Sequence, residues 1–565
     1  MEISKDRCIF RSQQLNGGNL MMNSAIMWLR AVLFTSLVFM SLLNLVACTS
    51  DTNTLLVTSS SADNRTDQFV AALKANGHVV QEGSMPLSDI AYYTNYNVTD
   101  SAAGFNYGVP YKRLQIPAYE ATEVEDQATK TSGIFRLQPY EAIVYVGLTP
   151  PLGDYFSFTP FLWSRSAGKV SKKGDWIFAA LGDPLNNTQI KAEGGGNTFQ
   201  KNTIIIFTAD QAVNDRIVAQ AKAAGYPESM INTYIFPSKL LNMGVNPLNA
   251  DNQDDSFLIL VRAANVYSVK SLNDYNNNDN YARVFRVTPT LNNIPNPLKP
   301  YDTPPMANRK ATPEKSPVTT TTKSLQDSLN DLKLAIIAKT TNLQYKNYES
   351  TRWFAESRDV LLATDRSLSN YHKFVAGEAS DTPYLRSSSG EVAANFTLGT
   401  DDMVIVYGIN HAATGLSIYS SFAVYGEKIL DPCPDDPILP NTPPKYTFGC
   451  GDPIWGGVVG MGNRDSKDPL YGKNNYTGSA NYYIPDDPNK EYLYAVRVLR
   501  KAPSDSERKP WIVVPEPTAE GGPASGIALT DPMFIGYRAY VSKITGHGPD
   551  YDDIIHDQAI WFKMK

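Results

Sequence analysis

The chain has 565 residues, of which 42% are hydrophobic and 19% charged, and its formal net charge is -6. The hydrophobic share is sufficient for a folded core and excludes a disordered chain. The acidic balance disfavours binding to nucleic acid or to an anionic lipid surface, because either needs a basic patch. At about 100–200 residues per domain, the length predicts several domains.

An uncharged apolar run lies close to the N-terminus. It covers residues 31–43, follows Arg30 and leads into the tetrapeptide Leu45-Val46-Ala47-Cys48. A positive flank, a short apolar stretch and small residues before a cleavage point are typical of a secretory signal. We therefore expect residues 1–47 to be a signal peptide, with the alternative of an uncleaved helix, which needs roughly 17–25 residues to span a membrane.

The first twenty residues fit a signal peptide poorly. They carry Lys5, Arg7 and Arg11. A long n-region would explain them, and so would a spurious extension if translation starts at Met21 or Met22.

The tetrapeptide ending at Cys48 resembles the lipobox of bacterial lipoproteins, and this resemblance covers only the N-terminal segment. It implies cleavage after Ala47 and a diacylglycerol on the Cys48 sulfur. Two or more acyl chains anchor a protein stably, at about 0.8 kcal/mol for each buried methylene. We expect a protein anchored on the extracytoplasmic face of a bacterial membrane. In bacterial lipoproteins, an Asp directly after the lipidated cysteine tends to retain the protein at the inner membrane. Position 49 is Thr instead, which favours the outer membrane in a cell that has one.

The cysteine count agrees with this compartment. Of the four cysteines, Cys8 would leave with the signal and Cys48 would carry lipid, so that Cys433 and Cys450 remain. An oxidising compartment favours a disulfide between them. Closing the proline-rich loop between them would stabilise the fold by about 3 kcal/mol. A metal site is the alternative, but neither cysteine has a C-x-x-C partner.

A proline- and threonine-rich stretch divides the chain. Residues 289–323 contain eight prolines and a run of four threonines. Since proline fixes φ and lacks a backbone donor, we expect a linker there. The predicted domains are residues 48–288 and 324–565, which are called the first and the second half below.

The two halves are distantly similar in sequence. Aligned without gaps, one pair of segments places Gly147 on Gly408 and Phe158 on Tyr419, and each half opens with a predicted helix. The similar segments, in chain order, are 143–163 with 404–424, 182–184 with 451–453, and 257–262 with 492–497. Each similarity is weak by itself because strands share β-branched residues. Their common order predicts a duplicated domain.

The clearest local unit is a strand, a helix and a strand in the first half. Residues 203–209 are predicted to form a short buried strand. Asp210 can cap a helix over 211–224 with apolar residues at helical spacing, and 231–236 is a second strand. Such a βαβ unit is normally parallel. Further strands are expected near Ile143, Phe156, Trp176, Phe257 and Ala282. The predicted fold is therefore α+β and strand-dominated, and the second half lacks the βαβ insertion.

No standard catalytic motif is present in the sequence. It contains no HExxH, P-loop, G-x-S-x-G or C-x-x-C-H. His411 follows an apolar strand, where a histidine can act as a general base, and the alternative is a loop histidine bonded to the backbone. Asp183 and Asp452 occupy the paired Gly-Asp-Pro sites. There they could share a proton or bind a metal, with structural turns as the alternative.

One acidic cluster near the C-terminus could bind a cation. Asp550, Asp552 and Asp553 offer the hard oxygen ligands that Ca²⁺ prefers, although their spacing is not that of an EF-hand. A solvated acidic turn is the alternative. No other cofactor is predicted.

Together these features predict a lipid-anchored extracytoplasmic binding or scaffold protein of the cell envelope. Its ligand, a protein or a glycan, cannot be named from the residues, and the lack of catalytic motifs speaks against an enzyme. The alternative is a cell-envelope hydrolase with His411, Asp183 and Asp452 in a site between the halves. A solute receptor is a third hypothesis, which the single crossing between the halves disfavours.

Overall fold

The computed structural model describes residues 59–88, 106, 109–165, 175–246, 254–310, 312–341, 343–362, 375, 377–390, 392–426, 428–429, 453–454, 458–460, 478–503, 510–517 and 526–563. The expected signal peptide, Cys48, the Cys433–Cys450 pair and Asp452 lie outside these residues. The described residues from Arg65 onward pack as one compact unit. In the described part of the chain, no helix is both long and apolar enough to span a bilayer.

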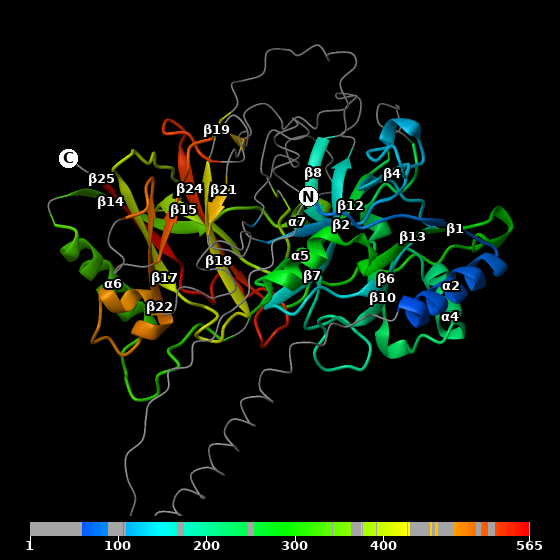
Figure 1. The fold of residues 1–565 in the computed structure, drawn as a ribbon, viewed down its shortest axis with the longest axis horizontal. Helices are drawn as coiled ribbons and strands as arrows, with labels where there is room; N and C mark the ends of the chain where they lie inside the picture. Colours follow the sequence, from blue (N-terminus) through cyan, green and yellow to red (C-terminus); the bar gives the residue numbers. More distant parts are fainter. Residues whose placement is uncertain are drawn as a thin grey trace, which may run out of the picture. The chain divides into compact units, whose positions relative to one another are not determined.

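The fold is α+β and strand-dominated, as the sequence predicts. The described α-helices are α2 (Ser59–Ala75), α4 (Gln211–Ala223), α5 (Val269–Asn277), α6 (Leu325–Lys339) and the short α7 (Ser357–Leu362). Strands account for more residues than these helices do (Figure 1).

The first half contains two sheets, A1 and B1. Sheet A1 has the order β1 (His78–Glu82), β13 (Ala282–Pro289), β6 (Ala142–Leu148), β10 (Asn202–Thr208) and β11 (Ile231–Ile235). Sheet B1 has the order β2 (Tyr111–Arg113), β12 (Ser256–Ala264), β7 (Tyr155–Arg165) and β8 (Asp175–Ala180), with β5 (Ile134–Phe135) beside β12 and β9 (Leu185–Asn186) beside β7. A small hairpin joins β3 (Ile116–Pro117) to β4 (Thr131–Ser132).

The second half contains one continuous sheet with two parts, A2 and B2. Part A2 has the order β14 (Gln344–Arg352), β25 (Gln558–Lys563), β17 (Met403–Ile409), β22 (Leu493–Leu499) and β23 (Trp511–Val513). Part B2 has the order β15 (Tyr384–Ser389), β24 (Met533–Tyr540), β18 (Tyr419–Gly426) and β21 (Val458–Gly460), with β16 (Val392–Ala393) beside β15. Strand β14 joins the parts by pairing with both β25 and β15. A separate pair joins β19 (Lys428–Ile429) to β20 (Pro453–Ile454).

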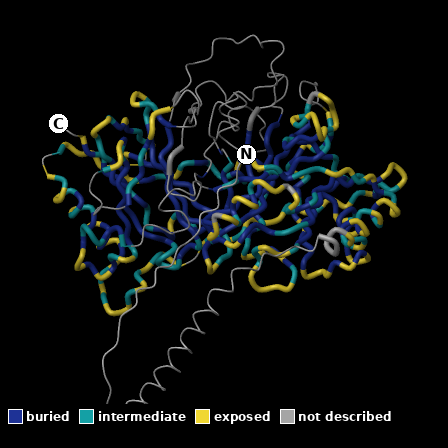
Figure 2. Tube along the Cα trace, viewed as in Figure 1, coloured by how far each residue is buried: buried dark blue, intermediate teal, exposed yellow. Residues whose placement is uncertain are grey.

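Both faces of sheet A1 are buried. Helices α2 and α4 cover one face, where Leu73 and Ile217 pack against Ile204 (Figure 1). The other face packs on sheet B1, and the rings of Tyr145 and Phe158 meet there at 4.9 Å. Figure 2 shows the strands of both sheets as buried and the loop tips as exposed. Burial on two faces explains why these strands are continuous apolar runs.

The predicted βαβ unit is confirmed. Strands β10 and β11 are parallel neighbours, and α4 connects them. The Asp210 side chain accepts a hydrogen bond of 3.0 Å from the Val213 amide, as an N-cap residue does. In the second half, β22 and β23 are also parallel, but the described residues between them contain no helix.

The two halves share one strand order. The order β1-β13-β6-β10-β11 in sheet A1 corresponds to β14-β25-β17-β22-β23 in A2, with one parallel pair at the same end. The order β2-β12-β7-β8 in B1 corresponds to β15-β24-β18-β21 in B2. Helices α2 and α6 precede the matching strands β1 and β14. The common origin of the halves stays a prediction, which this shared order supports.

The strand register defines which residues correspond. Arg262 in β12 lies opposite Tyr111 and Ser157, and Arg538 in β24 lies opposite Tyr384 and Ser421. The residues that follow these two strands, Asn265 and Val541, both have positive φ, of 51° and 52°. The correspondence therefore extends from the strand order to single residues.

Two of the expected correspondences are wrong. Residues 257–262 lie in β12 of sheet B1, whereas 493–497 of the matching segment lie in β22, which corresponds to β10 of sheet A1. Tyr419 corresponds to Tyr155 instead of Phe158, because the connection before β18 is three residues longer than the connection before β7. Apolar strands resemble one another in any sheet, which explains the first error.

Candidate functional site at the junction of the halves

A segment of the second half lies buried against sheet B1 of the first half. This junction segment, residues 377–382, precedes β15. The Gly377 amide donates to the Phe178 carbonyl at 2.7 Å, and the Ala180 amide donates to Ser357 Oγ at 3.0 Å. Gly377 has φ of 79°, and a Cβ there would lie 2.7 Å from the Phe178 ring. Glycine is therefore required at this close approach.

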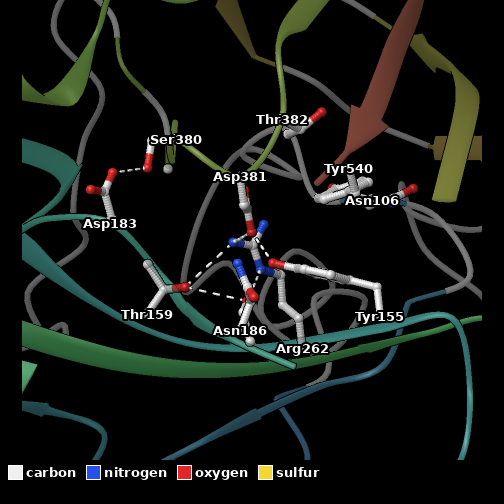
Figure 3. Close-up of polar contacts among 12 residues, drawn as sticks. Asn106, Tyr155, Thr159, Asp183, Asn186, Arg262, Ser380, Asp381, Thr382 and Tyr540 are labelled. Carbon is white, nitrogen blue, oxygen red and sulfur yellow. Dashed lines mark hydrogen bonds and ion pairs between the residues drawn. The ribbon is translucent and has the colours of Figure 1, made fainter. Parts of the chain in front are cut away.

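Asp381 of the junction segment is bound by two side chains of the first half. Arg262 Nη2 donates to Asp381 Oδ2 at 2.8 Å, and the Tyr155 hydroxyl donates to the same oxygen. Figure 3 shows Asp381 pointing at the guanidinium, with Thr159 on the other side. The side chains of Arg262 and Asp381 are 5% and 0% exposed. The ion pair is thus fully withdrawn from water.

A similar contact runs in the opposite direction. Asn106 of the first half donates from Nδ2 to the Tyr540 hydroxyl and accepts from Ser421 Oγ, both at 3.3 Å. The rings of Tyr155 and Tyr540 lie 5.0 Å apart between the two groups. Each half therefore contributes one short polar side chain to the matching strands of the other half.

Burial dominates the electrostatics of this junction. It raises the pKa of Asp381 well above its usual range, against the opposing effects of a backbone hydrogen bond and Arg538. Burial also raises the pKa of Tyr384 and Tyr540, so that these phenols are neutral at ordinary pH. The arrangement is suited to holding two surfaces together, because its polar atoms are directed at each other.

Asp183, a candidate from the sequence, also lies at this junction. Its carboxylate accepts hydrogen bonds from Ser380 Oγ in the junction segment and, at 2.9 Å, from the Ala307 amide in the predicted linker (Figure 3). The residue thus joins three parts of the chain. Its predicted partner Asp452 lies outside the described residues.

His411, the other candidate, is enclosed by two acids. Its Nδ1 lies 2.9 Å from Glu314 of the linker, and its Nε2 lies 3.4 Å from Asp557. Glu314, whose side chain is 0% exposed, also accepts hydrogen bonds from Thr414 Oγ1 at 2.5 Å and the Ile555 amide at 3.3 Å. Burial alone would lower the pKa of His411, but Glu314 and Asp557 outweigh it and raise the pKa to about 10.

These contacts do not link His411 with Asp183. In the described residues, the hydrogen-bond partners of His411 and those of Asp183 have no member in common. An imidazole with a pKa of about 10 is already protonated at neutral pH and cannot accept a proton there. The described contacts therefore favour structural roles for both residues.

The acidic turn near the C-terminus is held by its own hydrogen bonds. Asp550 Oδ1 accepts from the Asp552 amide at 3.1 Å, and the Asp553 amide donates to the Asp550 carbonyl at the same distance. Across the described residues, no group of three or more His, Cys, Asp and Glu side chains is arranged to hold a metal ion.

Sequence reasoning missed the residues that form the junction, namely Arg262, Asp381, Tyr155 and Asn106, and it missed Glu314, the partner of His411. A signal for part of the site was present. Strands β2 and β15 both begin in a Pro-Tyr-x-Arg motif, at Pro110 and Pro383, and β12 and β24 both contain Arg-Ala. Matching these short motifs would have identified Arg262 and Arg538 as corresponding residues.

Comparison with known proteins gives no functional information. No family model matches the chain, and no curated protein does. One solved structure that is similar is the VPA0106 protein from Vibrio parahaemolyticus, with 10% identity over 89% of this chain and 100% of that chain and a TM-score of 0.32. Another is an uncharacterized protein from Burkholderia cenocepacia, with 10% identity over 91% of each chain and a TM-score of 0.29.

Proposed function

We propose that the chain is a lipid-anchored extracytoplasmic protein of the cell envelope that binds or scaffolds a ligand there. The observation that carries the proposal is the apolar run ending in Leu45-Val46-Ala47-Cys48. The net charge of the remaining chain, -8 once the +2 of residues 1–47 is removed, suits a protein body exposed to water.

The described structure supports a binding or scaffold role over catalysis in one respect. The two buried groups of charges described above are engaged with each other: Arg262 with Asp381, and His411 with Glu314 and Asp557. A catalytic group must instead reach a substrate within hydrogen-bond distance. The hydrolase hypothesis would need catalytic residues other than His411 and Asp183.

The anchor can be tested in a bacterial host that acylates lipoproteins. We expect the membrane fraction to yield a mature N-terminus at Cys48 with the mass of an acylated cysteine, and C48A to be neither cleaved at this site nor acylated. The matched control is C8A, which changes a cysteine upstream of the cleavage point and should be processed normally. Detection of residues 1–47 on the mature protein, or equal acylation of C48A, would refute the proposal.

A further inference from the structure

A loop of the second half is held by side chains of the first half. This clasp loop, residues 542–547, lies after β24, and its Gly546 carbonyl accepts a hydrogen bond from Asn186 Nδ2 at 2.9 Å. The Thr188 hydroxyl and Gln189 Nε2 donate to the same carbonyl at 3.4 and 3.3 Å. Three neighbouring side chains of the first half therefore converge on one backbone oxygen of the second.

The last residue of the clasp loop, His547, presents its ring to the same amide group. Gln189 Nε2 lies 2.8 Å from Nε2 and 3.4 Å from Nδ1 of this half-buried histidine. An amide nitrogen only donates, so the contact needs a neutral imidazole, which keeps one nitrogen as an acceptor. Reversing the Gln189 amide would place its oxygen against the Gly546 carbonyl, which also needs a donor. The contact is therefore specific for the neutral ring.

The charges around the ring oppose its protonation on balance. Burial lowers the pKa of His547 from its ordinary value of 6.5, Arg309 of the linker acts in the same direction, and Asp183 acts against both. Arg309 is fixed beside the clasp loop, because its guanidinium donates to the Gly548 and Pro549 carbonyls at 3.1 and 3.0 Å. The side chains of the first half that hold the loop are uncharged, so they add no attraction for an imidazolium.

The clasp loop is also tied to the junction segment. The Ser542 amide donates to the His547 carbonyl at 2.6 Å and closes the loop. The Gly548 amide donates to the Ser380 carbonyl at 2.9 Å, and a Cβ on Gly548 would clash with the Thr382 amide. A displacement of His547 would therefore disturb the clasp and the segment that lies against sheet B1 together.

We propose that His547 and Gln189 form an acid-sensitive latch between the two halves. Protonation places a hydrogen on both ring nitrogens, so that donors of the ring and of the amide face each other and the contact is lost. Since the folded-state pKa lies below 6.5, the latch is complete at neutral pH and weakens as the pH falls below 6.5. The inference is independent of the proposed lipid anchor.

The first test is an NMR titration of the histidine rings in the full chain, with the His547 signal assigned from its absence in H547Q. We expect the wild-type ring to titrate below pH 6.5. Q189E replaces the donor by a carboxylate that accepts from the protonated ring, and it should move the titration to higher pH by about one pH unit or more. The same titration in Q189E and the wild type would overturn the proposal.

The second test measures hydrogen–deuterium exchange of residues 542–548 at about pH 5 and about pH 7.5, corrected for the intrinsic rate at each pH. Protection in the wild type should fall several-fold in acid. H547Q keeps an acceptor for Gln189 but does not titrate, so its protection should change less. This variant keeps the test decisive if Q189E does not fold, and equal losses in H547Q and the wild type would contradict the latch.

His556 supplies the matched control. Its Nδ1 and Nε2 lie 3.2 and 3.1 Å from the carbonyl oxygens of Ser350 and Tyr551, two acceptors that a protonated ring satisfies. H556Q should therefore lose protection of residues 542–548 in acid to the same extent as the wild type. If H556Q abolished the acid response instead, the response would belong to His556 and the proposal would be wrong.

Discussion

His411 shows how a pair of acids can turn a histidine from a base into a fixed cation. Its two nitrogens face Glu314 and Asp557, and these carboxylates raise the pKa to about 10 although the ring is buried. The imidazolium therefore attaches the predicted linker, through Glu314, to the second half. Its contribution is to stability and can be measured as such.

Stability should depend on the charge of His411 in a defined pH window. The folded-state pKa of about 10 lies above the ordinary value of 6.5, so the contribution is complete below pH 6.5 and is lost as the pH rises through 10. The free energy of unfolding should fall by up to about 1.4 kcal/mol per pH unit within this window. Urea denaturation of the wild type and H411Q at a series of pH values measures the difference.

His78 provides the control, because burial lowers its pKa from 6.5. A histidine with a depressed folded-state pKa loses its contribution as the pH falls, so H78Q should alter the profile in acid and leave the alkaline window unchanged. If H411Q and the wild type lose stability in parallel between neutral and alkaline pH, the proposed role of the imidazolium is wrong.

At the scale of elements, the sequence predicted those structures correctly that are formed by residues close together in the chain. The βαβ unit was predicted within one residue at each end, because its apolar spacing, its N-cap and its terminal glycine lie close together in the chain. The order of strands depends on pairing between distant segments. The apolar strands β12 and β22 look alike, yet they lie in different sheets.

The residues of the site could not be predicted for the same reason, because they are far apart in the chain. Asp381 and Arg262 are 119 residues apart in sequence, and His411 and Glu314 are 97 apart. No local spacing links such residues, and Glu314 lies in a segment whose composition predicts only a linker. Only the repeated Pro-Tyr-x-Arg and Arg-Ala motifs could have indicated that these strands share a role.

The N-cap of α4 connects this helix to the linker, and its removal should cost more than an ordinary cap. Asp210 is buried and accepts from the amides of Val213 and Lys299. D210A should destabilise the protein by about 2 kcal/mol or more, since a cap contributes about 1 kcal/mol and a second buried amide loses its acceptor. Denaturant titration measures this loss.

The comparison is S268A, which removes the exposed cap of α5, a hydrogen bond of 3.2 Å from the Ser271 amide. This variant should lose only about 0.5–1 kcal/mol. Equal losses in the two variants would show that the contact between Asp210 and Lys299 contributes nothing.

At the scale of the whole molecule, the shared strand order and the buried junction have different consequences. The shared order means that each half has a complete set of sheets and its own hydrophobic cores. The junction opposes their independence, because each half places a buried polar group in the other: Asp381 against Arg262, and Asn106 against Tyr540. If the halves separated, Arg262 and Asp381 would lose each other as partners and would have to be hydrated instead. The junction should therefore couple the unfolding of the halves.

This coupling predicts the effect of D381N on both halves. The substitution leaves Arg262 buried without its carboxylate, and breaking a buried pair in this way costs about 3–5 kcal/mol. Hydrogen–deuterium exchange of the amides in β6 of the first half and β17 of the second half reports the loss. If the halves unfold together, protection of both strands should fall by roughly the same factor, on the order of a hundredfold to a few thousandfold, since each 1.4 kcal/mol is tenfold.

D302N removes one partner of an exposed pair with Lys239 and should change protection little. A loss confined to one half would show that the halves unfold independently, whereas a loss as small as that of D302N would show that the junction does not hold them together.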